Sequence, residues 1–222
     1  MNTRRSSLRT WSALLLIPAF VLIFCAGCEM EVERTFAKDF DYGDNNPNLA
    51  LAIGDSITYG YELDNPNQAY PAQLAGMLGY SVINAGVPGD RSADCIARLG
   101  GLLARYKPGM VIILAGANDV IHGHVDDTTA GNLSRMIEMA KANKSLPVIC
   151  TMTPAFRAHR FMTSSILDMN TKIRVMAEAD GAVLADLFEA YGNNGDYLQH
   201  DGLHPNATGQ HLIALTIYEQ LQ

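Results

Sequence analysis

One apolar run near the start of the chain constrains the fold more than any other feature. Residues 49–53 are all apolar, and the run stops abruptly at Gly54-Asp55-Ser56. A short, continuous apolar run that ends in a turn signal is typical of a strand buried in a parallel sheet. Because ligands of open α/β sheets bind outside the carboxyl ends of the strands, Ser56 would be exposed on a rigid element. The segment predicts either a nucleophilic serine or an ordinary strand-to-helix turn, since Gly, Asp and Ser are common turn residues.

The rest of the chain alternates between apolar runs and segments with helical spacing. Strands are predicted at residues 49–53, 81–84, 110–114, 147–150 and 182–185, and helices at 70–78, 92–106, 128–143, 164–178 and from 205 or 206 to the C-terminus. Residues 151–163 and 186–204 are predicted to be mostly loop. Strands that alternate with helices imply a parallel sheet with right-handed crossovers. The predicted fold is therefore a flavodoxin-like, three-layer α/β/α sandwich with a five-stranded parallel sheet.

The charge balance limits the kinds of partner that the protein can bind. The 222 residues include 16 Lys and Arg against 23 Asp and Glu, a formal net charge of -7. Three of the basic residues and none of the acidic ones lie in residues 1–28, so the remainder is more acidic still. An acidic body argues against binding of nucleic acid and against adhesion to anionic lipid. We therefore expect no nucleic-acid partner.

Residues 1–28 have the composition of an export signal. Three arginines lie within residues 4–9, and the apolar stretch at residues 11–24 suits a signal peptide better than a spanning helix. The stretch ends in Cys25-Ala26-Gly27-Cys28, which resembles the lipobox of bacterial lipoproteins, with Cys25 where leucine is usual. We expect Cys28 to be lipidated; a plain cleaved signal and an uncleaved anchor are the alternatives. Residues 3–9 also resemble a twin-arginine signal, so both export routes stay open.

These features predict an exported protein of the cell envelope that is anchored to a bacterial membrane by lipid. Cys28 is followed by Glu29 and not by the aspartate that often retains lipoproteins at the inner membrane. In a bacterium with two membranes we therefore expect the periplasmic side of the outer membrane. Residues 29–47 are polar and are predicted to form a tether, with an early helix as the alternative. Residues 48–222 would then form the folded domain, which we expect to be a monomer.

Polar residues follow several of the predicted strands, at the edge where strand ends meet. Ser56 follows the first strand, Gly89 the second and Asn118 the third, and Asp201 and His204 precede the last helix. Acyl transfer needs a hydroxyl nucleophile, a base for its proton and donors for the developing oxyanion. Ser56 offers the hydroxyl, His204 the base and Asp201 a carboxylate to orient the imidazole. Asn118 and the N–H groups of Gly89 and Ser56 would form the oxyanion hole.

Four sequence blocks resemble the SGNH/GDSL hydrolase family over essentially all of residues 48–221. The blocks are GDS at 54–56, NAGVPGD at 84–90, GAND at 116–119 and DGLH at 201–204, the last followed by proline. The resemblance implies Ser56 as nucleophile, His204 as base and Asp201 as its support. It also implies Ser56, Gly89 and Asn118 as oxyanion donors. Within the family the chain looks most like the exported bacterial thioesterase, lysophospholipase and arylesterase branch.

The resemblance implies a serine esterase that hydrolyses carboxylic ester or thioester bonds through an acyl-enzyme. Its substrate would be a small acyl ester or a lipid, and no cofactor and no metal would be needed. A carbohydrate acetylesterase is the alternative, since Tyr59, Tyr61 and Asn65 lie close to Ser56 in the sequence. A third hypothesis is a binding module that has lost catalysis, although every expected catalytic position is filled.

Several other residues close to the blocks have two interpretations each. Asp119 is predicted to brace its loop by hydrogen bonds. The pairs His122/His124 and His200/His204 have no obvious third ligand, which argues against a metal site. Candidates for an acyl pocket or for plain packing are Phe156, Phe161 and Met162, and candidates for substrate contact are Val120, Ile121 and Val125. Cys95 and Cys150 fall in buried elements on different parts of the sheet, so free thiols are expected.

Overall fold

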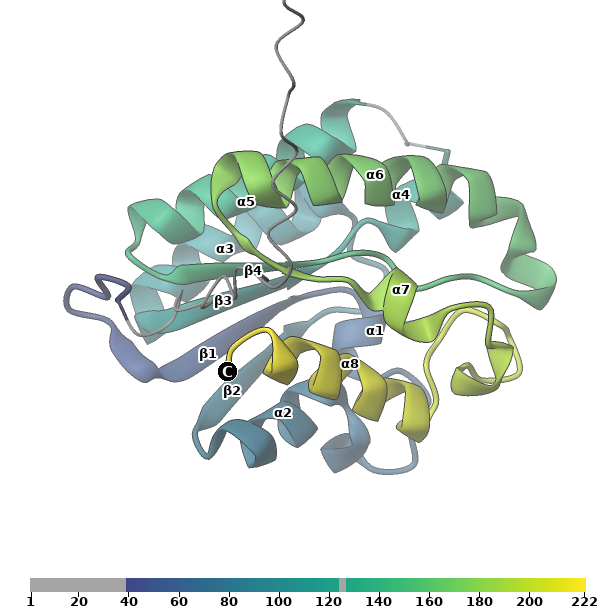
Figure 1. Cartoon of the computed structure of the whole chain (residues 1–222), viewed down its shortest axis with the longest axis horizontal. Coiled ribbons are helices and arrows are strands. Elements are labelled where there is room, and N and C mark those ends of the chain that lie inside the picture. The colour runs from purple at the N-terminus through teal and green to yellow at the C-terminus, as the bar shows by residue number, and fades with distance from the viewer. Residues whose placement is uncertain (1–38, 124–126) are drawn as a thin grey trace, which may run out of the picture. The chain divides into compact units, whose positions relative to one another are not determined.

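The computed structural model describes residues 39–123 and 127–222, and within them five parallel strands form one sheet (Figure 1). The strands are β1 (Asn46–Gly54), β2 (Ser81–Gly86), β3 (Pro108–Leu114), β4 (Leu146–Cys150) and β5 (Val183–Ala185). Their order across the sheet is β2-β1-β3-β4-β5. This is the flavodoxin-like order, so the predicted five-stranded parallel sheet is confirmed.

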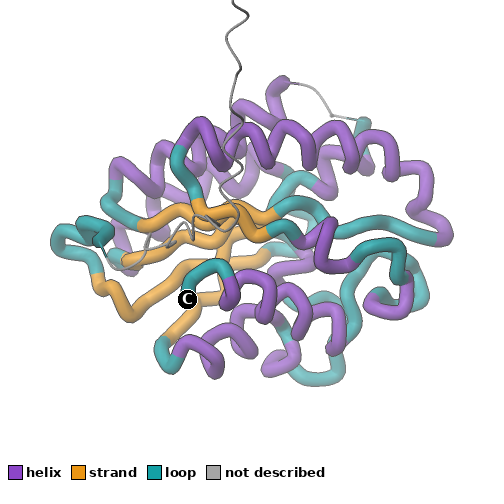
Figure 2. Tube along the Cα trace, viewed as in Figure 1, coloured by secondary structure: helices purple, strands orange, loops and turns teal. Residues whose placement is uncertain are grey.

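Helices cover both faces of the sheet, which forms the middle layer (Figure 2). On one face α3 (Ser92–Tyr106), α5 (Asp127–Ala142) and α6 (Thr163–Asp180) pack side by side, and on the other α2 (Tyr70–Leu78) packs against α8 (Ala207–Glu219). Shorter helices lie in the connections: α1 (Ser56–Tyr59), α4 (Ala117–Ile121) and α7 (Leu187–Tyr191), with 3-10 turns at Pro66–Gln68, Arg157–Met162 and Gly195–Tyr197. The predicted three-layer sandwich is confirmed.

The side chains of the central strands alternate between two apolar cores. Leu51 and Ile53 of β1 and Ile113 of β3 face the layer of α3, α5 and α6. Ala52 and Ile112 face the layer of α2 and α8. All seven residues of β3 are buried, as expected for a strand that is covered on both sides. Because burial of each Leu or Ile side chain is worth about 1.5–3 kcal/mol, these strands form a rigid base for the loops at their ends.

The structure differs from the predicted tether at residues 29–47 in its last part. β1 begins at Asn46, two residues before the predicted start of the domain. Before it, Phe40 and Tyr42 pack against the α2/α8 core, and the side-chain amide of Asn45 donates to the carbonyl oxygen of Lys144 at 3.0 Å. The segment from residue 39 onward therefore belongs to the domain, because its aromatic side chains have apolar surface to cover. Residues 29–38 lie outside the described residues.

The predicted loops also contain short helices. α1, α4 and α7 have only four or five residues each, and α7 lies within the predicted loop at 186–204. Helices of this length show no repeated apolar spacing, so periodicity cannot reveal them. The predicted signal peptide at residues 1–28, including Cys28, lies outside the described residues. Across residues 39–123 and 127–222, no helix is both long and apolar enough to span a membrane.

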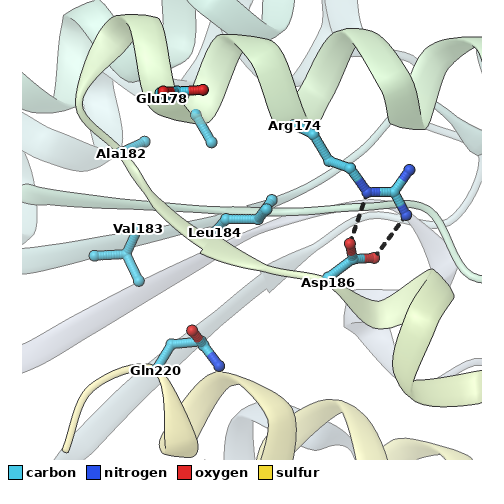
Figure 3. Close-up of a pocket in the computed structure, with 8 residues that line it drawn as sticks. Arg174, Glu178, Ala182, Val183, Leu184, Asp186 and Gln220 are labelled. Carbon is cyan, nitrogen blue, oxygen red and sulfur yellow. Dashed lines mark hydrogen bonds and ion pairs between the residues drawn. The ribbon is translucent and has the colours of Figure 1, made fainter. Parts of the chain in front are cut away.

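A hollow of about 570 Å³ lies along β5, at the outer edge of the sheet (Figure 3). Its lining includes Arg174 of α6 and Asp186, which follows β5. The two side chains form a two-pronged ion pair, with N–O distances of 2.7 and 3.0 Å. No residue of the predicted site lines this hollow.

Candidate active site

Ser56 lies at the point where β1 gives way to α1. Asp55 caps this short helix, and its Oδ1 accepts a hydrogen bond from the N–H of Ile57 at 2.9 Å. Ser56 is the first residue of the helix, and Gly60 ends it in a left-handed conformation. The capping aspartate satisfies an N–H that the helix itself leaves unpaired, which fixes the turn on which Ser56 is presented.

Two glycines allow the backbone around Ser56 to pack closely. A Cβ at Gly54 would lie 2.2 Å from the carbonyl oxygen of Leu114 at the end of β3. A Cβ at Gly86, the last residue of β2, would lie 2.2 Å from the backbone nitrogen of Tyr59. Real side chains do not tolerate such distances, so glycine is needed at both positions. The ends of β1, β2 and β3 therefore meet directly beneath α1.

The structure brings Ser56, His204 and Asp201 into one hydrogen-bonded chain. The Nε2 atom of His204 lies 3.0 Å from Oγ of Ser56, and its Nδ1 atom lies 2.5 Å from Oδ2 of Asp201. The other carboxylate oxygen of Asp201 accepts from the backbone N–H groups of Leu203 and His204 at 2.9 and 3.1 Å. Serine and histidine are 148 residues apart in the sequence, and the fold unites them.

The environment of Asp201 favours its ionised form. Partial burial acts against ionisation, but the N–H of Leu203 and both the ring and the backbone of His204 hold the pKa below its ordinary value. Asp201 is therefore a carboxylate at neutral pH. A carboxylate at Nδ1 fixes the proton there and leaves Nε2 free to accept the proton of the serine hydroxyl.

The loop that carries Asp201 and His204 is held by backbone contacts. Gly202 has φ +74°, and a Cβ there would lie 2.5 Å from the carbonyl oxygen of Phe156. The N–H of Phe156 donates to the Gly202 carbonyl at 2.8 Å, and the N–H of Gln199 donates to the His204 carbonyl at 2.8 Å. The loop is thereby fixed to the segment after β4, with the imidazole turned toward Ser56.

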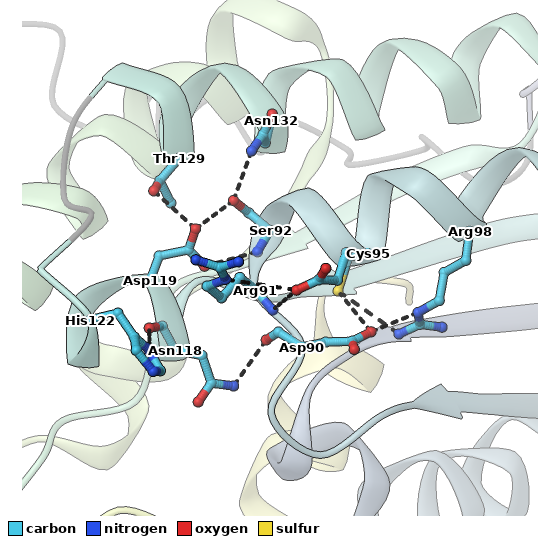
Figure 4. Close-up of polar contacts among 11 residues, drawn as sticks. Asp90, Arg91, Ser92, Cys95, Arg98, Asn118, Asp119, His122, Thr129 and Asn132 are labelled. Atoms are coloured by element: carbon cyan, nitrogen blue, oxygen red, sulfur yellow. Dashed lines mark hydrogen bonds and ion pairs between the residues drawn. The ribbon is translucent and has the colours of Figure 1, made fainter.

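Gly89 lies in the loop after β2 and Asn118 in α4, which follows β3. Figure 4 shows Asn118 beside Asp90, the residue after Gly89. Gly89 has φ +87°, and no heavy atom lies within 4 Å of the position that its Cβ would take, so its backbone is open to a ligand. The side-chain Nδ2 of Asn118 donates to the carbonyl oxygen of Asp90 at 2.9 Å. Because a carboxamide carries two N–H groups, the second remains to donate to a ligand.

Asp119 braces the loop of Asn118, as predicted (Figure 4). Its two carboxylate oxygens accept from the backbone N–H of Ser92 at 2.8 Å, the hydroxyl of Ser92 at 2.7 Å and the hydroxyl of Thr129 at 3.1 Å. Asp119 is only 5% exposed. It therefore ties α4, which carries Asn118, to the first turns of α3 and α5.

A small apolar hollow lies among residues that neighbour Ser56, Asn118 and His204 in the chain. Its volume is about 10 Å³, which is room for about one water molecule. It is lined by the immediate neighbours of Ser56, Asn118 and His204, which are Asp55, Ile57, Ala117 and Leu203, and by Met162 among others. Met162 is thus the one of the three predicted acyl-pocket residues that lines this hollow. A methionine side chain is flexible enough to change its size.

The other candidate residues have different surroundings. Phe156 lines a separate hollow of about 290 Å³, and Phe161 is 65% exposed. Val120 is buried in the core and Ile121 packs against it, so both residues serve packing. Val125 lies outside the described residues. Cys95 and Cys150 are buried free thiols, as predicted. Among the described residues no cluster of three metal-ligating side chains occurs, and His124 lies outside them.

Two contacts of the site were not foreseen from the sequence. The ring of Tyr61 lies against the imidazole of His204, with centroids 4.9 Å apart. The buried side chain of Gln210 on α8 donates to the carbonyl oxygen of Ile57 at 2.9 Å and accepts from the N–H of Tyr70 at 2.8 Å. Gln210 therefore joins α8 to α1 and α2, and no local pattern marks a glutamine that bonds 153 residues away.

Serine, histidine and aspartate linked in this way, beside open N–H groups, are the arrangement of serine hydrolases. The fold and the site together define the protein as a serine hydrolase on an α/β sandwich. Residues 52–212 match the model of the GDSL-like lipase/acylhydrolase family, and the chain belongs to this family. The predicted resemblance and the prediction of an ester-hydrolysing enzyme are thereby confirmed.

The chain is similar to named proteins of this family along most of its length. It is 31% identical over 177 residues to thioesterase 1/protease 1/lysophospholipase L1 of Escherichia coli (strain K12), covering 78% of this chain and 82% of that protein. It is 28% identical to an arylesterase of Vibrio mimicus, covering 77% and 86%. The crystal structure of a lipase/acylhydrolase from Enterococcus faecalis matches with a TM-score of 0.69 at 28% identity, covering 78% of this chain and 95% of that one.

The buried carboxyl of Asp55 leads to a prediction about pH. Burial raises its pKa to about 7, the N–H of Ile57 opposes this, and the nearby charges of Asp119 and Asp90 add to it. The folded chain then binds more protons than the unfolded chain between about pH 4 and 7, so stability falls as pH rises, by up to ~1.4 kcal/mol per pH unit. We expect Asp55→Asn to flatten this slope, as measured by urea unfolding at pH 5, 6, 7 and 8.

The matched control is Asp64→Asn, which removes an exposed carboxyl from the loop after α1. This variant should keep the slope of the unmodified protein. Equal slopes for Asp55→Asn and the unmodified protein would show that Asp55 is ionised throughout this range.

Proposed function

We propose that the protein hydrolyses carboxylic esters and acyl thioesters through an acyl-enzyme on Ser56. The observation that carries this proposal is the chain of hydrogen bonds from Oγ of Ser56 through His204 to Asp201. In this mechanism Nε2 of His204 takes the hydroxyl proton as Oγ attacks the acyl carbon. The same proton then passes to the departing alcohol or thiol. Water, deprotonated by His204, releases the acid and restores the serine.

The negative charge on the attacked oxygen needs donors that are already in place. We assign the N–H groups of Ser56 and Gly89 and the Nδ2 of Asn118 to this role. The open backbone at Gly89 and the second N–H of Asn118 support the assignment. Preorganised donors of this kind need no rearrangement as the charge forms, and removal of one typically lowers kcat by about 10²–10³-fold.

The size of the hollow behind the site supports short acyl groups as the preferred substrates. At about 10 Å³ it has no room for a long chain unless side chains such as Met162 move. A methyl or ethyl group would fit in the hollow with a small displacement of its lining side chains, whereas an octanoyl chain would have to bind along the protein surface.

A carbohydrate acetylesterase is the second candidate, supported by the aromatic residues beside the site. Tyr61 lies against the His204 ring and is 39% exposed, and Tyr59 is 53% exposed. Because His204 protonates the leaving group, Tyr61 lies on the side where a sugar alcohol would depart. An exposed aromatic face suits a sugar ring as well as an aryl alcohol.

The two candidates differ in what Tyr61→Ala should do. If the leaving group is a sugar, the change should raise KM for acetylated xylan by about two- to tenfold, because a ring contact is worth roughly 0.5–1.5 kcal/mol. KM for ethyl acetate, which has no ring, should stay unchanged. Acetyl release from xylan that is slower than octanoyl ester cleavage, and is unaffected by Tyr61→Ala, would rule out the sugar candidate.

The nucleophile is tested by Ser56→Ala in the purified full chain. We expect p-nitrophenyl esters from acetyl to palmitoyl to be hydrolysed fastest at the short end. The variant should lower kcat by on the order of 10⁶-fold, because the acyl-enzyme can no longer form. Ser134→Ala removes a serine hydroxyl on α5 that bonds Asp180, and it should keep the normal rate. Unchanged hydrolysis by Ser56→Ala would refute the proposal.

We also propose that the protein is exported and held at the cell envelope by a lipid on Cys28. The basic and apolar segments of residues 1–24 and the small residues before Cys28 support this. About ten residues, 29–38, would then link the lipid anchor to the domain, which begins at residue 39. An extended chain of that length spans at most about 36 Å. The site would therefore operate close to the membrane surface.

Cys28→Ala should move the protein from the membrane fraction to the soluble fraction of cells that express the full chain. The mass of the N-terminal peptide should lose its acyl groups at the same time. Cys25→Leu, which restores the usual lipobox residue, should leave both unchanged. A membrane-bound Cys28→Ala protein without acyl groups would point to an uncleaved anchor instead.

A further inference from the structure

The loop that carries Gly89 and the helix α4 that carries Asn118 are separate from β1, which leads into Ser56, so a contact must hold them in register. We infer that Arg98 is a positioning residue that holds the loop of Gly89, and through Asp90 the side chain of Asn118, at the end of β1. The inference rests on the proposed function, because it concerns the donors that would stabilise the oxyanion.

Arg98 lies on α3 and contacts both parts at once, and Figure 4 shows its contact with Asp90. Its Nε donates to Oδ2 of Asp90 at 2.7 Å, and its Nη2 donates to the carbonyl oxygen of Gly54 at 2.9 Å. Gly54 is the last residue of β1, two positions before Ser56. The rigid planar fork of the guanidinium therefore fixes the distance between the strand that leads to the nucleophile and the residue after Gly89.

Asp90 passes this constraint on to Asn118. Its carboxylate receives Arg98, and its carbonyl oxygen receives Nδ2 of Asn118 at 2.9 Å. One N–H of the carboxamide is thereby fixed, which sets the direction of the other. A single chain of contacts, Gly54–Arg98–Asp90–Asn118, thus joins the strand end beneath Ser56 to both of the other oxyanion donors.

The ion pair between Arg98 and Asp90 is partly shielded from water, so its electrostatic attraction is screened less than that of a surface pair. The side chains of Arg98 and Asp90 are 26% and 14% exposed. The carbonyl oxygen of Gly54 also accepts the N–H of Val87 at 3.1 Å, so the loop after β2 is held to β1 both directly and through Arg98. Loss of the arginine would leave a largely buried carboxylate without its cation, and the Asp90 loop would have to shift to reach water.

The chain offers a matched control in the ion pair of Arg174 and Asp186 beside β5 (Figure 3). That pair has the same N–O distance of 2.7 Å and a similar exposure, 36% and 28%. It also joins a helix to the end of a strand, but its partners carry none of the proposed catalytic groups. Arg98→Gln and Arg174→Gln therefore remove similar ion pairs in different places.

The experiment measures kcat, KM and thermal midpoint of the purified full chain with p-nitrophenyl acetate. For Arg98→Gln we expect kcat to fall by about 10–100-fold, since a small displacement of oxyanion donors costs this much, with KM changed less than about threefold. Arg174→Gln should keep kcat while losing a comparable amount of thermal stability. Arg98→Lys should recover part of kcat, because an ammonium group can pair with Asp90 but cannot span both partners as the fork does.

A double variant separates positioning from general damage. If Arg98 acts through the carboxamide, Arg98→Gln should lower kcat much less in an Asn118→Ala background than in the unmodified protein. Full additivity, or a kcat for Arg98→Gln equal to that of Arg174→Gln, would overturn the inference. If Arg98→Gln fails to fold, Arg98→Lys and Asp90→Asn carry the same comparison.

Hydrogen exchange provides a readout that does not depend on turnover. We expect the amides of residues 54–60 and 86–91 to exchange faster in Arg98→Gln and to be unchanged in Arg174→Gln. Unchanged exchange in Arg98→Gln would refute the inference whatever the substrate. An inactive unmodified protein, or an active Ser56→Ala, would instead count against the proposed function, and the exchange data would still decide the role of Arg98.

Discussion

The absence of a side chain at Gly54 is the constraint on which the site depends. Only there can the end of β1 approach the Leu114 carbonyl and the side chain of Thr58 closely enough to seat α1. The Gly54 carbonyl then accepts both the N–H of Val87 and the guanidinium of Arg98. The backbone of Gly54 therefore fixes the position of Ser56 above the sheet and its distance from the loop after β2. The apolar core beneath the sheet edge keeps this arrangement rigid.

Three carboxyl groups lie around this point, and the protein stabilises each in a different way. Asp90 has an arginine, Asp119 is held by hydroxyl and amide donors, and Asp55 caps a helix in an apolar setting. Burial raises the pKa of Asp55 to about 7, and the nearby charges of Asp119 and Asp90 add to this rise. Asp90 is thus paired with a cation, and Asp119 is held by hydrogen bonds from neighbouring donors. Asp55 is left with a pKa close to neutral pH.

The five parallel strands, the layers and the site residues Ser56, Asp201 and His204 could be predicted because each has a local signal in the sequence. Buried strands such as β3 are unbroken apolar runs, and glycine and proline separate them from the helices. The contacts of Arg98 and Gln210 could not be predicted, because a polar residue on a half-buried helix face does not reveal a partner far away in sequence. The small hollow was also missed: Met162 and Phe161 are neighbours with similar hydropathy, and only the backbone path decides that one lines it and the other is exposed.

The link between α8 and α1 has a consequence for the order in which the site comes together during synthesis. A chain that emerges from its N-terminus carries Ser56 early, but His204 follows 148 residues later and Gln210 later still. Until then the serine has neither its base nor the buried glutamine that holds its helix. A chain that lacks this later segment therefore has the serine hydroxyl without a proton acceptor, and the proposed chemistry requires synthesis to have passed Gln210.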